Sequence, residues 1–176
     1  MSTHKDVASP TATGGSGTFF EQHVGALFLA LMLVRGIPPI LKDCQIEEVH
    51  FQTAHLGWQT DDLLAIGIQA SSGQRRRLAM QAKRNFTISS KNEDCRATFT
   101  GFWNDFKHNT NFNSDHDRLS LVTLRGTDAL LNKFNSLLDC ARASENNADF
   151  ARRIAPSGYL SKEALGHSDA IKTIIQ

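Results

Sequence analysis

Residues 61–84 read DDLLAIGIQASSGQRRRLAMQAKR, and this stretch decides the fold. After its first residue, the run from residue 62 to 70 is almost uninterruptedly apolar, which is typical of a strand buried on both faces. Ser71-Ser72-Gly73 supplies turn residues, and residues 76–83 predict the second strand of an antiparallel hairpin. A short turn brings the start of the first strand beside the end of the second.

The flanking segments predict helices and further strands around this hairpin. Upstream, Thr18-Phe19-Phe20-Glu21 matches a capping box and opens a helix that stops at Gly36. This helix is apolar almost all round, so we expect it to be deeply buried. The other predicted elements are a strand over residues 46–54, a helix over 92–108, a strand over 118–124, a helix from Gly126-Thr127 to Ala141 and a C-terminal helix from Ser161.

This order of elements predicts an α/β fold. A meander of three strands, followed by a helical crossover to a fourth strand, gives a mixed four-stranded sheet with helices on both faces. The length of 176 residues suits one domain, which we place at residues 18–160 after a Gly- and Ser-rich leader over residues 1–17. Residues 161–176 are expected to form a helix linking to a region beyond this sequence, the alternative being a natural terminus.

Composition narrows the class of protein. No run of about 18 apolar residues without charge occurs, so no membrane span is expected. The N-terminus lacks the layout of a secretory signal, and the three cysteines are widely spaced and odd in number. This cysteine usage favours a reducing cytoplasm over a disulfide framework and offers no zinc-finger spacing.

Polar residues stand at three places where packing alone would not require them. Asp61 and Asp62 precede the most apolar strand, and Gln81 and Lys83 share one face at the end of its partner. Glu21 lies in the first turn of the apolar helix, on a face that looks inward. Hard oxygen ligands bind Mg²⁺, which lowers the pKa of bound water and stabilises charge on a phosphate. A lysine beside them can hold the attacking water or the transition state.

An acidic helix, an Asp at a strand start and a Gln-x-Lys on the neighbouring strand resemble the PD-(D/E)xK restriction-endonuclease-like superfamily. Asp62 stands for the Asp of that motif, and Gln81-Ala82-Lys83 stands for its (D/E)xK element. Together with the Gly-Gly-x-Gly before the helix, the pattern is similar to one branch in particular. That branch comprises the N-terminal nuclease domains of bacterial anti-phage effectors, among them STAND NTPases and nucleases activated by nucleotide signals.

The resemblance implies a fold, an activity and a role for each residue. It implies a restriction-endonuclease-like core and a Mg²⁺-dependent endonuclease, with Mn²⁺ as the alternative metal, that cuts double-stranded DNA. Asp62 would be the central metal ligand, Asp61 an auxiliary carboxylate (or the reverse), Lys83 the catalytic lysine and Glu21 the acidic residue of the helix. Gln81 stands where the superfamily more often has Asp or Glu, so the site loses a charge that Glu21 replaces. The full protein would act as a homo-oligomer, switched by a C-terminal sensor or NTPase region.

Plainer interpretations stand beside these roles. Glu21 could be only a capping residue, Asp61-Asp62 only a turn, and Gln81 and Lys83 the polar side of an exposed strand. The alternative function is therefore a catalytically silent, DNA-binding or assembly module with the same fold. A third hypothesis is a related nuclease acting on RNA or on modified DNA.

Charge is unevenly distributed although the net charge is only +1. Residues 43–62 contain five acidic residues and no Lys or Arg, whereas residues 75–84 contain five basic residues and no acid. The basic residues outside the motif are candidate phosphate contacts: Arg75, Arg76, Arg77 and Arg84. Without a large positive field, DNA binding by the lone domain is expected to be weak and sensitive to salt.

Overall fold

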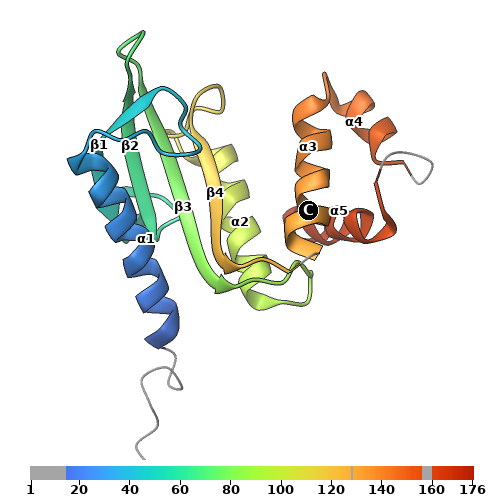
Figure 1. Cartoon of the computed structure of the whole chain (residues 1–176). Coiled ribbons are helices and arrows are strands. Elements are labelled where there is room, and N and C mark those ends of the chain that lie inside the picture. The colour runs from blue at the N-terminus through green and yellow to red at the C-terminus, as the bar shows by residue number, and fades with distance from the viewer. Residues whose placement is uncertain (1–14, 128, 156–159) are drawn as a thin grey trace, which may run out of the picture. The chain divides into compact units, whose positions relative to one another are not determined.

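A computed structural model describes residues 15–127, 129–155 and 160–176 (Figure 1). The elements are α1 (Gly15–Leu33), β1 (Cys44–Phe51), the 3₁₀ helix η1 (Thr53–Leu56), β2 (Leu63–Gln69), β3 (Arg75–Asn85), α2 (Glu93–His108), β4 (Arg118–Arg125), the π-helical turn η2 (Ala129–Phe134), α3 (Asn135–Ala143), α4 (Asn147–Arg153) and α5 (Lys162–Ile175). The chain divides into two compact units. Unit 1 comprises residues 1–84 and 105–124, and unit 2 comprises residues 85–104 and 125–176, so the boundary runs through α2.

Unit 1 is built on a four-stranded mixed sheet with strand order β1-β2-β3-β4. β2 is antiparallel to both β1 and β3. The backbone N–H of Arg77 bonds Asp117, and the Thr123 hydroxyl bonds the carbonyl of Arg84, so β4 runs parallel to β3. The predicted α/β class, with a mixed sheet and helices, is confirmed.

The two faces of the β2–β3 hairpin carry different apolar clusters. On one face, Leu63, Ala65, Leu78 and Met80 pack with Val24 and Phe28 of α1. On the other face, Leu64, Ile66 and Ala79 pack with Trp58. The sequence prediction that both faces of β2 are buried is therefore confirmed. The turn closes where predicted, with Gly73 in the left-handed region at a φ of 70°.

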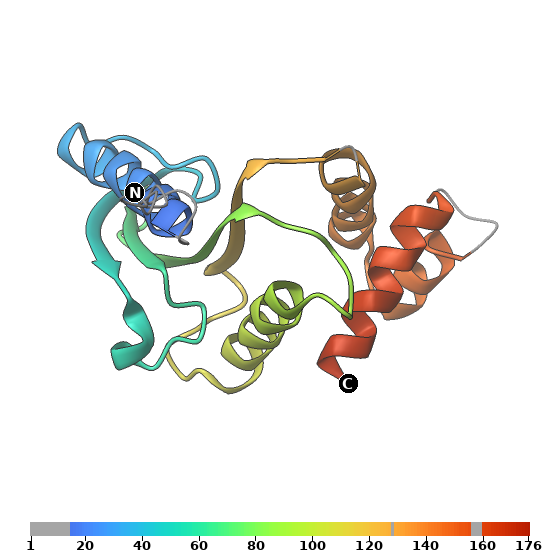
Figure 2. The same cartoon turned by 90° about the horizontal axis from the view of Figure 1, so that it is seen from below.

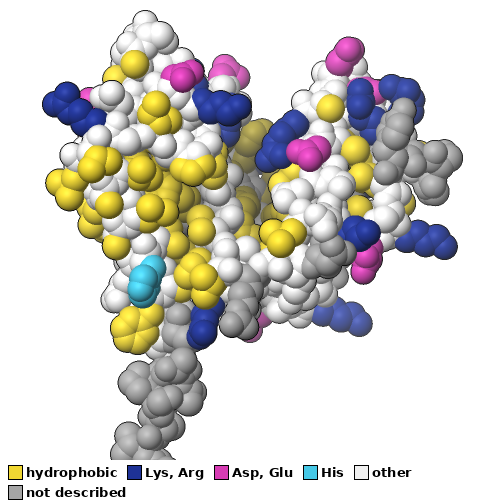
Figure 3. Space-filling model, in the orientation of Figure 1, with side chains coloured by type: hydrophobic (Ala, Val, Ile, Leu, Met, Phe, Trp, Pro, Cys, Tyr) yellow, Lys and Arg dark blue, Asp and Glu magenta, His cyan; other side chains and the backbone are white. Residues whose placement is uncertain are grey.

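The expected deep burial of α1 is wrong. Val24 and Phe28 are buried on its inner side, where α1 lies against the sheet in Figures 1 and 2. Its outer side exposes large apolar residues, and Figure 3 shows hydrophobic side chains gathered on this part of the surface: Phe19, Leu27, Leu29 and Leu33, followed by Val34, Ile37 and Ile40. Composition reveals that a helix is apolar but not which sides are covered. In the described part of the chain, no helix is long and apolar enough to cross a membrane.

The predicted capping box of the first helix is also wrong in detail. α1 begins at Gly15, so Thr18 lies inside the helix rather than at its cap, and the last three residues of the expected leader are helical. The remainder of that leader lies outside the described residues. At α2, the side chain of Asn92 accepts a hydrogen bond from the Cys95 N–H at 2.8 Å, so Asn92 caps this helix.

Unit 2 has a helical core of its own. Phe99 of α2 lies edge-on to Phe86 and Phe134, with ring centroids 6.3 and 6.0 Å apart. Helix α3 packs against both α4 and α5, and α5 also packs against η2 (Figure 2). The predicted single helix over residues 126–141 is instead a π-helical turn followed by α3, and α4 is an additional helix that its short polar sequence did not reveal.

Candidate active site at the start of β2

Asp62 and Gln81 meet where β2 starts and the partner strand approaches its end. Leu63 pairs with Met80 in the antiparallel register, so Asp62 and Gln81 are the next pair and share a face. The Gln81 Nε2 donates a hydrogen bond to the Asp62 Oδ2 at 2.5 Å. The backbone N–H of Ala82 donates to the same oxygen at 2.7 Å. The carboxylate of Asp62 is thus fixed through its Oδ2 atom, and neither of these two hydrogen bonds uses its Oδ1 atom.

Three more charged residues act on this carboxylate. Burial raises the pKa of Asp62 from 3.8 to about 6, against the lowering effect of the Ala82 N–H. The negative charges of Glu21 and Asp61 raise it further, and the positive charge of Lys83 lowers it. Every residue predicted for the catalytic motif is therefore within electrostatic reach of Asp62. Three acidic groups share this corner of the sheet with one lysine.

The loop before Asp62 is held from two sides. On the η1 side, the Thr53 N–H donates to the carbonyl of Asp61 at 2.7 Å and the Gln52 N–H donates to that of Asp62 at 3.3 Å. On the α2 side, the carboxylate of Asp105 accepts from the backbone N–H groups of Gln59 and Thr60, at 3.0 and 2.7 Å. Asp105 was not singled out from the sequence, because no spacing distinguishes one acidic residue within an amphipathic helix.

The arginines at the start of β3 do not lie beside Asp62. Arg75 is six residues before Gln81 along the strand, which is about 20 Å, and Arg77 is about 13 Å away. Arg75 pairs with Glu48 at 2.5 Å, and Arg77 pairs with buried Asp117 at 3.5 Å.

The other two candidate arginines also face away from the motif residues. Arg76 donates to the side-chain carbonyl of Gln69 at 2.7 Å. Alternation along β3 places both Arg76 and Arg84 on the opposite face from Gln81 and Lys83. Arg75, Arg76 and Arg77 therefore do not form the predicted phosphate contacts next to Asp62. Of the four candidate arginines, only Arg84 is adjacent to Lys83 in the strand.

The donor set fits a hard divalent cation in type and in charge. Asp62, Glu21 and Asp61 bring carboxylate oxygens, and the Gln81 amide keeps its carbonyl oxygen outside the hydrogen bond to Asp62. Burial is the largest cause of the raised pKa of Asp62; the negative charges of Glu21 and Asp61 add to it, and the positive charge of Lys83 opposes them. In the described residues no three His, Cys, Asp or Glu side chains converge closely enough to form a metal site by themselves. Mg²⁺ keeps several waters and needs only one or two protein carboxylates, so the donors suffice.

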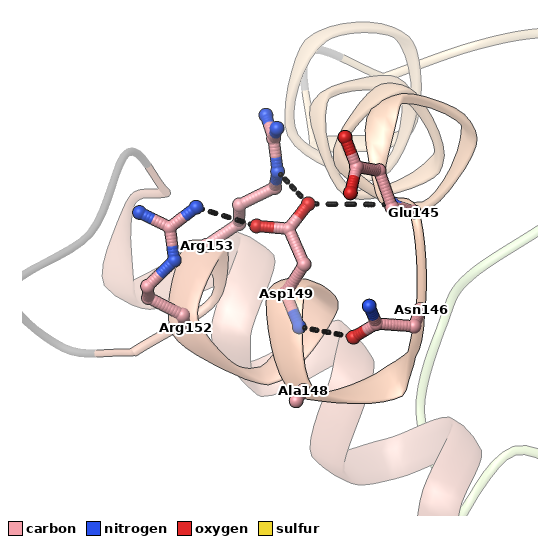
Figure 4. A pocket seen from close by; sticks show the side chains of 6 residues that line it. All are labelled: Glu145, Asn146, Ala148, Asp149, Arg152 and Arg153. Atoms are coloured by element: carbon pink, nitrogen blue, oxygen red, sulfur yellow. Dashed lines mark hydrogen bonds and ion pairs between the residues drawn. The ribbon is translucent and has the colours of Figure 1, made fainter.

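Two cavities lie elsewhere, in unit 2. One, of about 390 Å³, surrounds the start of α4, where Asp149 accepts hydrogen bonds from Arg152 and Arg153, and these hydrogen bonds lower its pKa to about 2 (Figure 4). The other, of about 490 Å³, lies between α5 and residues 88–90 and is lined by His167 and Glu163. The charged side chains that line the cavity in Figure 4 pair with one another within one short helix, so neither its charge nor its shape marks a reaction site.

Comparison with known proteins gives no relative. No family model, no curated protein and no solved structure matches this chain. Any function must therefore be argued from the residues around Asp62.

Proposed function

We propose that this chain is a metal-dependent endonuclease domain that hydrolyses phosphodiester bonds of double-stranded DNA. The observation that carries the proposal is the hydrogen bonding of Asp62 to both Gln81 and Ala82, with Lys83 one residue further along the strand. These are the positions at which the sequence resembles the PD-(D/E)xK motif. The fold that brings them together is a mixed four-stranded sheet with α1 on one face.

The residues divide the chemistry among them. Bound Mg²⁺ would supply a polarised water and stabilisation of charge on the phosphate. Asp62 and Glu21 would hold the ion, while the Gln81 and Ala82 donors keep the Asp62 carboxylate in one orientation. Lys83 brings a positive charge to the same corner, where it can stabilise the negative charge that develops on the phosphate. Since each carboxylate must be ionised to bind, the site should bind metal well above pH 6 and poorly below it.

Plasmid cleavage tests the activity directly. Lys83→Ala should lower the rate of cleavage of supercoiled plasmid in Mg²⁺ or Mn²⁺ at least a hundredfold. Its circular dichroism and melting temperature should stay close to those of the wild type. Lys42→Ala, which changes an exposed lysine in the loop before β1, is the matched control and should cleave normally. Cleavage by folded Lys83→Ala at the wild-type rate, or wild-type cleavage unaffected by EDTA, would refute the assignment.

The biological setting rests on the resemblance. We infer an effector of bacterial anti-phage defence, acting in the cytoplasm and activated when a C-terminal sensor or NTPase region brings several copies together. Clustering raises the local concentration of nuclease domains along one duplex, and two paired sites can cut both strands. Enforced dimerisation, for example by a fused coiled coil, should accordingly increase plasmid cleavage by this chain.

A catalytically silent DNA-binding or assembly module is the second candidate. It is favoured by the neutral Gln81, which donates its amide to Asp62 instead of bringing a further carboxylate to the site. Calorimetric titration with Mn²⁺ separates the two functions, because a silent module has no need of the ion. If the chain is a nuclease, parallel digestion of RNA, unmodified DNA and methylated DNA shows which of these substrates it cleaves.

A further inference from the structure

Asp105 is a buried carboxylate whose hydrogen bonds are directed at the loop before Asp61 and Asp62. It lies in the last turn of α2, within unit 1, and is only 1% exposed. Its Oδ1 accepts from the Gln59 N–H at 3.0 Å and its Oδ2 from the Thr60 N–H at 2.7 Å. A buried carboxylate is costly unless it is fully hydrogen-bonded, so its presence needs a reason.

A side chain just beyond the end of α2 extends the same attachment. The Nδ2 of Asn109 donates to the Asp105 Oδ1 and to the carbonyl of Gly57, at 3.3 Å in both cases. Residues 57–60 are therefore held at three backbone groups by the side chains of Asp105 and Asn109. The next two residues along the chain are Asp61 and Asp62, whose carbonyls are held by Thr53 and Gln52 on the other side.

We propose that Asp105 is a positioning residue for the metal-binding carboxylates, fixing the loop of residues 57–60 so that Asp62 meets Gln81 and Ala82. The role rests on the proposed function in so far as it concerns metal. Its structural part, the placement of the Asp62 carboxylate, does not depend on that function. Groups that orient ligands from behind change metal affinity by roughly 10- to 100-fold when they are removed.

The same sheet offers a matched control. Asp117 is also 1% exposed and also accepts from two backbone N–H groups, those of Arg77 at 2.7 Å and Asn113 at 2.9 Å. It lies beside the start of β3, about 13 Å along the strand from Gln81. Asp105→Asn and Asp117→Asn thus make the same chemical change at similar burial, and only the first touches the loop before Asp62.

Two measurements on the full chain test the proposal. The first is amide hydrogen exchange in metal-free protein, because the Ala82 N–H is bonded to Asp62 itself and reports directly on that carboxylate. Asp105→Asn should speed exchange at Ala82 and Thr53 at least tenfold relative to Asp117→Asn, after correction for global stability. The second is Mn²⁺ affinity by calorimetry, which should fall 10- to 100-fold in Asp105→Asn and less than threefold in Asp117→Asn.

Each outcome decides something. Equal exchange at Ala82 in the two variants would overturn the positioning role, as would equal loss of Mn²⁺ affinity. Faster exchange at Ala82 in Asp105→Asn alone, in a protein that binds no Mn²⁺, would support the positioning role and refute the metal-dependent function. If Asp105→Asn does not fold, Asn109→Ala replaces it, because this variant keeps the Asp105 carboxylate and removes only a side chain that supports it. Asn109→Ala should change the Ala82 exchange rate and the Mn²⁺ affinity in the same directions by smaller factors. The absence of any change in both measurements would overturn the proposal.

Discussion

At the scale of single residues, the candidate site sets function against stability. Asp62 is partly buried beside two other acidic residues, and its pKa of about 6 means that folding opposes its ionisation. Ionised Asp62 is the form that can bind a cation. The metal-free protein therefore carries an electrostatic cost at neutral pH that a bound divalent ion would relieve.

Asp62→Asn should make the metal-free protein more stable at pH 8. A carboxyl whose folded pKa lies above its unfolded value of 3.8 stabilises the fold only below that value, and loses this contribution as the pH rises through about 6. For a fully buried group the shift would correspond to roughly 3 kcal/mol, which solvent screening of this half-buried carboxyl reduces to about 1 kcal/mol. Asn keeps the oxygen that accepts from Gln81 and Ala82.

Urea denaturation in EDTA at two pH values measures this effect. At pH 8 the free energy of unfolding of Asp62→Asn should exceed that of the wild type by about 1 kcal/mol. The difference should vanish near pH 3.5, where Asp62 is protonated. A less stable Asp62→Asn at pH 8 would show that the carboxylate is a structural group. That result would contradict the argument that ionised Asp62 is electrostatically unfavourable in the metal-free protein.

At the scale of helices and strands, the hairpin was the most predictable part of the molecule. An apolar run, a Ser-Ser-Gly turn and a second strand determine the register, and the register alone brings Asp62 to Gln81. The exposure of α1 was not predictable, because hydrophobicity does not say which side of a helix is covered. Asp105 was missed for a related reason: its role depends on a contact across 45 residues of sequence, which no local pattern encodes.

Gly25 lets α1 approach β1 closely, which gives a prediction for this pair of elements. A Cβ at position 25 would lie 2.3 Å from the Cε1 of Phe51, so the ring or the helix must move. Gly25→Ala should destabilise the protein by about 1–3 kcal/mol, the usual cost of overpacking. In a Phe51→Ala background the clash is gone, and the same substitution should stabilise by up to about 1 kcal/mol through helix propensity.

A double-mutant cycle by chemical denaturation gives the coupling between the two positions. Since Phe51 is 43% exposed, the loss of its ring should be tolerated well enough for all four proteins to fold. A coupling energy near zero would mean that the ring swings aside freely. Gly25 would then have no role in seating α1 against the sheet.

At the scale of the whole molecule, the basic segment at residues 75–84 offers DNA less positive charge than its sequence suggests. The net charge of +1 hides a basic segment at residues 75–84, but its first residues are already engaged. Arg75 pairs with Glu48 and Arg77 with Asp117. The described ion pairs thus neutralise much of the patch that the sequence offered as a phosphate contact surface, and only Lys83 and Arg84 continue toward the end of β3 near Asp62.

DNA binding should therefore depend on the end of β3 and not on its start. Fluorescence anisotropy of a labelled duplex in EDTA, measured from 50 to 200 mM salt, gives the number of phosphate contacts from the slope of log affinity against log salt. Arg84→Ala should lower the magnitude of that slope by about one, as expected for the loss of one phosphate contact, and should weaken binding irrespective of sequence. Arg75→Ala, its control on the same strand, should leave slope and affinity unchanged within twofold, because its charge is already matched by Glu48. The reverse result, with Arg75 controlling the slope, would place DNA along the hairpin turn, about 20 Å from Gln81, and would separate the binding surface from the site proposed for cleavage.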